Sequence, residues 1–169
     1  LILILPPPPI AEPLNHLRQK YDPRSQAICP AHISISDPLR CEMTADLEAE
    51  ISGILGCIEP FELHYSTPQA SVERAGIACQ VGPQDRIDAL KEALHLAAAF
   101  AGQAYRRRDI PAHLTIAEFI SIEEGLKLIP TLRRTVAAGS FVCDRLGFVV
   151  PDEAFCFRRK STFFLGAAS

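Results

Sequence analysis

The stretch Pro-Ala-His-Ile-Ser-Ile at residues 30–35 returns, with small changes, as Pro-Ala-His-Leu-Thr-Ile at residues 111–116. Polar and apolar residues alternate in each copy, which is the pattern of a β-strand with two different faces. The histidine and the hydroxyl residue share one face, and the apolar residues share the other. A single His-x-Ser/Thr match carries little information. Two copies that both begin with Pro-Ala and have apolar residues at the same positions predict two related strands, each buried on one side.

The composition indicates one folded unit. Hydrophobic residues make up 48% and charged residues 22% of the 169 residues, which suffices for a substantial core. We expect a single domain over residues 1–169, made of two interleaved lobes. The net charge of −3 gives no overall attraction to nucleic acid, so a polyanion must be bound by a local basic patch.

The N-terminal run and the cysteines indicate the compartment. The apolar run at residues 1–5 is too short to cross a membrane and lacks the features of a secretory signal. The six cysteines are scattered singly, with no C-x-x-C pair. This spacing favours small buried thiols in a reducing compartment over disulfides or a zinc ribbon. We expect a soluble, cytoplasmic protein without membrane contacts.

Periodicity and turn residues divide the chain into strands and helices. Ser121 and Glu124 have capping-box spacing, Leu126 is expected to face inward, and Pro130 is expected to kink or divide that helix. Residues 21–25 have turn chemistry. The order predicts an α+β fold. The expected strands are residues 1–5, 27–36, 61–66, 76–81, 110–120, 141–150 and 154–165, and the expected helices are residues 10–21, 44–56, 83–102 and 121–136.

If the two halves of the chain pack about a pseudo-twofold axis, the polar faces of both motif strands meet. The two histidines and the two hydroxyl residues then lie close together. Near neutral pH one imidazole can be protonated while the other is not, as concerted acid–base catalysis requires. Ser34 and Thr115 are rigidly placed donors for the oxygens of a phosphate. No metal-binding signature is present. A metal bridged by His32 and His113 stays an alternative, but the sequence offers no third ligand.

The paired motifs resemble those of the 2H phosphoesterase superfamily, also described as 2′-5′ RNA ligase-like proteins. The opening strand, the proline-rich turn, the helix ending in Tyr-Asp-Pro and the closing Phe-Phe-Leu-Gly are similar too. The resemblance implies a bilobal fold with two pseudo-symmetric lobes, antiparallel-rich sheets and flanking helices around a central, water-filled cleft. It implies that His32 and His113 are catalytic and that Ser34 and Thr115 hold the phosphate. Serine in place of threonine in the first motif is a mild departure. Which histidine is the base stays open.

Two basic clusters are candidates for contacts with the rest of a substrate. One is the arginine run at residues 106–108, with Arg108 nearest the second motif, although such a run is often only a solvated face. The other contains Arg158 and Arg159 among phenylalanines, an arrangement that can bind a backbone and stack bases. Those phenylalanines are more often core residues. The three remaining histidines are given no site role, and Glu118 is expected to pair with an arginine or to orient a histidine.

The resulting prediction is a metal-independent phosphoesterase, without cofactors, that opens 2′,3′-cyclic phosphates by two-histidine acid–base catalysis. Its partner would be RNA with a cyclic phosphate end, or a small cyclic nucleotide, and the protein is expected to be a monomer. Two alternatives stay open. One is a phosphodiesterase acting on a non-RNA, nucleotide-derived metabolite. The other is a non-catalytic module that binds RNA or a nucleotide.

Overall fold

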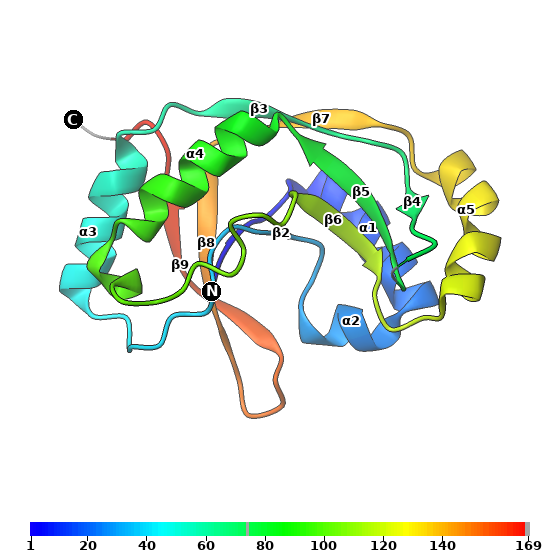
Figure 1. Ribbon diagram of the computed structural model, residues 1–169, viewed down its shortest axis with the longest axis horizontal. Coiled ribbons are helices and arrows are strands. Elements are labelled where there is room, and N and C mark those ends of the chain that lie inside the picture. The colour runs from blue at the N-terminus through cyan, green and yellow to red at the C-terminus, as the bar shows by residue number, and fades with distance from the viewer. Residues whose placement is uncertain (74, 168–169) are drawn as a thin grey trace.

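The computed structural model describes residues 1–73 and 75–167. It is an α+β fold with two antiparallel sheets (Figure 1). The first sheet has the order β2-β1-β8-β9, with β1 at Ile2–Ile4, β2 at Ile33–Ser34, β8 at Arg145–Pro151 and β9 at Phe157–Phe164. The second sheet has the order β4-β5-β3-β7, and β6 pairs with β5. Its strands are β3 (Phe61–Tyr65), β4 (Gln69–Ala70), β5 (Ile77–Gly82), β6 (His113–Ala117) and β7 (Gly139–Cys143). The expected α+β class with antiparallel sheets is confirmed.

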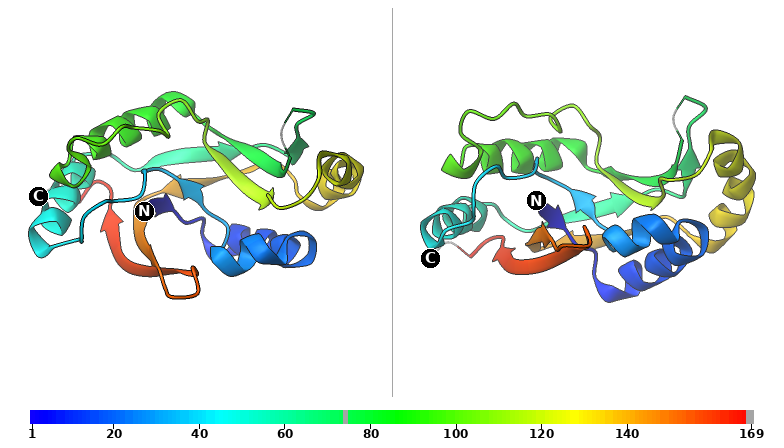
Figure 2. Two further views of the ribbon diagram at one scale, coloured as in Figure 1. Left: turned by 60° about the horizontal axis from the view of Figure 1, so that its bottom comes forward. Right: turned by 90° about the horizontal axis from the view of Figure 1, so that it is seen from below.

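The helices flank the two sheets. In Figure 1 α3 and α4 lie on one side of the molecule, and α1, α2 and α5 lie on the other; the two turned views in Figure 2 keep this division. Helix α1 packs on β6, α3 on β9 and α5 on β4. The helices are α1 (Pro8–Tyr21), α2 (Pro23–Ile28), α3 (Ala45–Gly56), α4 (Gln84–His95) and α5 (Ile122–Thr135), with a 3-10 turn, η1, at Ala98–Phe100.

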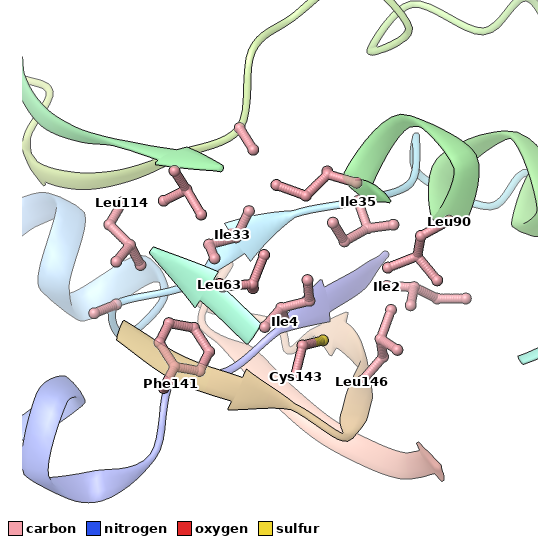
Figure 3. Packing of buried hydrophobic residues seen from close by; sticks show 14 of the residues in the cluster. Ile2, Ile4, Ile33, Ile35, Leu63, Leu90, Leu114, Phe141, Cys143 and Leu146 are labelled. Atoms are coloured by element: carbon pink, nitrogen blue, oxygen red, sulfur yellow. The ribbon is translucent and has the colours of Figure 1, made fainter. Parts of the chain in front are cut away.

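The apolar residues of both motifs lie in one core. Ile33 and Ile35 of the first motif and Leu114 and Ile116 of the second are completely buried. They belong to the cluster shown in Figure 3, where Ile2 and Ile4 of β1 and Leu63 of β3 meet them. The histidine and hydroxyl residues between them are only half-buried. The alternation predicted from the sequence is therefore present in both copies.

The first motif strand is much shorter than predicted. Residues 23–28 form α2, because the Asp22 side chain accepts a hydrogen bond from the N–H of Ser25 and so caps a helix that begins at Pro23. The turn prediction for residues 21–25 is therefore wrong beyond Asp22. Only Ile33 and Ser34 pair as a strand, with Ile4 and Leu3 of β1.

Several other boundaries differ from the prediction. The run at residues 141–150 is two strands in different sheets, separated at Asp144, and residues 69–70 add the short strand β4. Helix α4 ends at His95 rather than near residue 102. Helix α5 continues through Pro130, and Leu126 is exposed rather than inward. The predicted capping box of Ser121 and Glu124 is confirmed.

Two expectations about the surface and the thiols can be compared with the structure. Within residues 1–73 and 75–167, none of the helices combines the length and the apolar character needed to span a bilayer. All six cysteines are free thiols. Burial was predicted for them in general, but Cys41 and Cys57 are exposed, and Cys156 is partly exposed. Only three of the six are buried, as core residues of the sheets and of the segment before the first motif.

Candidate active site

Strands β2 and β6 contact each other, so the two motifs lie side by side although they belong to different sheets. Each histidine is held by its own motif. The Nδ1 atom of His32 lies 2.7 Å from the carbonyl oxygen of Pro30, and Nδ1 of His113 lies 2.8 Å from that of Pro111. A carbonyl oxygen only accepts, so Nδ1 is the protonated nitrogen in each ring. In both residues Nε2 is left to accept or donate a proton.

The two hydroxyl residues accompany the histidines on the half-buried face of each motif. Neither the Ser34 nor the Thr115 hydroxyl has a hydrogen-bond partner within the described part of the chain. Their backbones are fixed: Ser34 pairs with Leu3 of β1, and Thr115 pairs with Ala78 of β5. Hydroxyls on paired strands without internal partners are suited to donate to an anion.

The electrostatic surroundings distinguish the two rings. Burial lowers the pKa of His32 from 6.5 to about 4, and the positive charges of Arg18 and Arg107 act in the same direction. The charge of His113 also lowers this pKa, which places the two imidazoles within electrostatic reach of each other. The hydrogen bond to the Pro30 carbonyl opposes the shift. His32 is therefore neutral at pH 7, the state that a general base requires.

A buried arginine that the sequence analysis overlooked joins the two motifs. Arg18 of α1 is 2% exposed. Its guanidinium donates to the carbonyl oxygen of Thr115 at 2.6 Å and to that of Cys29, just before the first motif, at 2.8 Å. It also donates to the carbonyl and hydroxyl oxygens of Ser25 in α2. Five donors in a planar fork allow one side chain to hold several segments at once.

One turn further along, Asp22 makes a second connection. Its carboxylate accepts hydrogen bonds from the N–H groups of Glu118 and Phe119, at 2.6 and 2.9 Å, directly after β6. Burial raises the pKa of this carboxyl, but its backbone donors and the nearby Arg18 outweigh burial and leave the pKa below its ordinary value. Glu118 was expected to pair with an arginine or to orient a histidine; its backbone N–H donates to Asp22. Burial lowers the pKa of Arg18, and the negative charge of Glu118 acts in the opposite direction. Arg18 lies in the last turn of α1, and Asp22 is the residue that directly follows this helix.

A cavity of about 370 Å³ opens beside the second motif. It adjoins His113 and Thr115 but not the first motif, so it is less central than the expected cleft. Among its described lining residues there is no lysine or arginine. Small residues and amides dominate the wall: Gln69, Ala70, Ser71, Ala75, Gly76, Ile77, Ala78, Gln80, Ile110, Pro111, Ala117 and Glu118 complete it.

The predicted substrate-binding arginines have different surroundings. Arg108 forms a salt bridge with Glu92 at 2.7 Å, and Arg158 forms one with Asp152 at 2.9 Å, both at the surface. Arg159 has no ion-pair partner among the described residues; its side chain crosses Gly147, and it lines a separate cavity of about 520 Å³. Within the run at residues 106–108, the arginine whose charge lowers the pKa of His32 is Arg107, the neighbour of Arg108.

Metal binding was considered from the sequence as a minor alternative. In the part of the chain that the structure describes, no group of three or more histidine, cysteine, aspartate or glutamate side chains is arranged to hold a metal ion. The two histidines direct Nδ1 to backbone carbonyls, which leaves one nitrogen from each ring.

Comparison with known proteins gives the family. Residues 6–154 match the family described as the 2′-5′ RNA ligase superfamily. The chain belongs to this superfamily, as the resemblance of its paired motifs indicated. A Bacillus cytotoxicus protein named "Putative phosphoesterase" is 28% identical over 172 residues, covering 99% of this chain and 97% of that protein.

Solved structures show the same fold. LigT of E. coli, in a crystal structure complexed with 3′-AMP, superposes with a TM-score of 0.60 at 16% identity, covering 97% of this chain and 95% of that one. The Thermus thermophilus protein TT0787 gives a TM-score of 0.55 at 10% identity over 98% of this chain and 96% of its own. At these identities the likeness establishes the architecture, that of the LigT-like 2H phosphoesterases.

Proposed function

We propose that the protein is a metal-independent phosphodiesterase that opens 2′,3′-cyclic phosphates on RNA ends or small nucleotides. The observation that carries this proposal is the paired arrangement of the motifs. Two motifs in contact each present an imidazole whose Nδ1 is held by a carbonyl and a hydroxyl that has no partner among the described residues. Membership of the 2′-5′ RNA ligase superfamily and the likeness to a protein named as a phosphoesterase support the same reaction class.

The proposed mechanism assigns different roles to the two rings. Neutral His32 accepts a proton at Nε2 from a water molecule, whose oxygen forms a new bond to phosphorus. The bond from phosphorus to one ribose oxygen breaks, and His113 donates a proton from Nε2 to that leaving oxygen. Ser34 and Thr115 donate hydrogen bonds to the non-bridging oxygens, where negative charge builds up. Proton exchange with water then restores both histidines.

The assignment of His32 as the base follows from its surroundings rather than from the motif. Burial and two arginine charges lower its pKa to about 4, so the ring is neutral at pH 7 and its Nε2 carries no proton. The same two arginines lie within electrostatic reach of an anionic phosphate held between the rings. The sequence alone left this assignment open, since the two motifs are nearly identical.

A second candidate function, a phosphodiesterase for a nucleotide-derived metabolite outside RNA, is favoured by one observation. The cavity beside His113 is lined mostly by small residues and amides, with Glu118 as its carboxylate and no described lysine or arginine. Such a wall suits a neutral nucleoside or a similar group better than a run of phosphates, which needs basic partners.

The test is an assay of cyclic mononucleotides and of oligonucleotides with cyclic phosphate ends, in the presence of a chelator. Removing a catalytic acid or base costs about 10²–10⁴-fold, so we expect His32→Ala and His113→Ala each to lower kcat by that much. His64→Ala, an exposed histidine on β3, is the matched control and should leave kcat unchanged. Full turnover in the His32→Ala, His113→Ala double variant would exclude the mechanism. Binding without turnover by the wild-type protein would favour the non-catalytic alternative.

A further inference from the structure

The peptide group that opens the first motif is bound at both of its polar atoms. The N–H of Ala31 donates to Oδ1 of Asn15, in α1, at 2.7 Å. The carbonyl of the same peptide group belongs to Pro30 and accepts from Nδ1 of His32 at 2.7 Å. The Asn15 side chain of α1 is thus linked to the His32 imidazole through a single peptide group.

The second motif repeats this arrangement with another helix. The N–H of Ala112 donates to Oε1 of Gln84, the first residue of α4, at 3.1 Å. The carbonyl of that peptide group, on Pro111, accepts from Nδ1 of His113 at 2.8 Å. Two different amide residues, on two different helices, therefore occupy the same position relative to the two motifs.

The orientation of the Gln84 amide is determined by its other neighbour. Its Nε2 donates to Oδ1 of Asp88 at 2.7 Å, which turns Oε1 towards the N–H of Ala112. Asp88 is itself held by Lys91, a buried residue whose Nζ lies 3.2 Å from the same oxygen. The amide has only one orientation that satisfies both partners.

A bond to the N–H end of a peptide group acts on its carbonyl end in two ways. The group is planar, so fixing the N–H direction fixes the direction of the carbonyl oxygen. Hydrogen bonds in a chain also polarise one another, so the carbonyl becomes a stronger acceptor. Both effects keep a proton on Nδ1, so that Nε2 is the nitrogen that takes up a proton in the neutral ring and gives one up from the imidazolium.

We propose that Asn15 and Gln84 are matched positioning residues, each of which holds the opening peptide group of one motif so that its carbonyl keeps the histidine in the Nδ1–H tautomer. Neither residue needs to touch the substrate. The effect on turnover rests on the proposed phosphodiesterase function, whereas the tautomer of each ring does not.

The experiment measures the tautomers directly, by NMR of protein with ¹⁵N-labelled histidine at a pH where both rings are neutral. Asn15→Leu and Gln84→Met remove the acceptor oxygen at nearly constant volume. We expect Asn15→Leu to add the Nε2–H form at His32 only, and Gln84→Met to add it at His113 only. Asn15→Asp restores an acceptor oxygen and should restore the tautomer. Gln19→Met, an exposed position on α1, is the control and should change neither ring.

Turnover gives the second readout. Loss of a group that orients a reacting histidine typically costs 10–100-fold, so we expect kcat to fall by about that factor in each variant with KM little changed. If either substitution unfolds the protein, Asn15→Ala and Gln84→Ala give the same two readouts. Folded variants with wild-type tautomers at both rings would overturn the proposal. The expected tautomer changes in a protein without phosphodiesterase activity would overturn the proposed function and leave this inference intact.

Discussion

At the scale of single residues, two histidines in nearly identical motifs have different surroundings. The first copy follows α2 and lies near Arg18 and Arg107, and burial lowers the pKa of His32 to about 4. These features come from residues outside the motif, so the motif alone could not reveal them. In the sequence, Arg18 is only a polar residue next to Leu17 on an amphipathic helix, and nothing there indicates that it is buried.

The low pKa of His32 predicts the acidic limb of the pH profile. A base must be unprotonated, and kcat/KM reports the ionisation of the free enzyme. We expect kcat/KM for a cyclic nucleotide to persist well below pH 6.5 and to fall only as the pH approaches about 4. The measurement is kcat/KM between pH 4 and 8, with far-UV circular dichroism to monitor folding. A limb at or above pH 6.5 would show that another group is the base.

At the scale of elements, the C-terminal end of α1 connects the two motifs. Arg18 reaches the carbonyls of Thr115 and Cys29, and Asp22 accepts the N–H groups that follow β6. The Asp22 carboxylate also caps α2. The mutual position of β2 and β6 thus depends on two side chains one helical turn apart.

The Asp22 connection predicts how stability depends on pH. Its folded pKa is below the ordinary value, so its contribution is complete above the unfolded pKa of about 4 and is lost as the pH falls through the folded pKa. We expect Asp22→Asn to lower the free energy of unfolding by about 1–3 kcal/mol at pH 7. The asparagine side chain has one neutral acceptor oxygen, which accepts less strongly than a carboxylate, and its NH₂ group cannot accept from the backbone N–H groups. This loss should shrink at low pH.

Urea unfolding of both proteins at pH 7 and at the lowest pH where the wild type stays folded measures this difference. Asp109→Asn changes an exposed carboxylate and should stay within about 0.5 kcal/mol of the wild type. A loss of stability in Asp22→Asn that is the same at both pH values would contradict the role assigned to the charge.

The elements that local signals determine were predicted well. The capping box of Ser121 and the alternation in both motifs depend on residues close in sequence, and both are present. Predictions failed where distant contacts decide. Pro130 lies within a helix that continues past it, and residues 141–150 split between two sheets because each half pairs with a different partner. Asn15 and Gln84 gave no signal, since their role exists only once helix and motif meet.

At the scale of the whole molecule, the net charge of −3 and the pairing of surface arginines limit long-range attraction to RNA. Arg108 and Arg158 are already engaged by carboxylates, and the described walls of the cavity beside His113 contain no basic residue. Each phosphate contact contributes a slope of about −0.7 to log K against log salt for single strands.

This charge distribution predicts a weak salt dependence. We expect KM for a cyclic-phosphate oligonucleotide to rise by less than tenfold between about 50 and 200 mM salt, because few phosphates beyond the reacting one find a cation. Steady-state kinetics with an oligonucleotide and a mononucleotide at several salt concentrations measure this. A steep slope confined to the oligonucleotide would instead indicate an extended RNA-binding surface, and its loss in Arg159→Ala would locate that surface.

The strand order also determines when the site can form during synthesis. The strands of the second sheet all lie between residues 61 and 143, whereas β1 lies between β2 and β8 in the first sheet, and β8 begins only at residue 145. Until β8 leaves the ribosome, β1 and β2 have only each other, and an isolated two-stranded unit is marginally stable. The second sheet, which carries the second motif, can therefore be complete while the first sheet, which carries the first motif, still lacks β8 and β9. We therefore expect the pairing of the two motifs to become stable only late in translation, when β8 and β9 complete the first sheet.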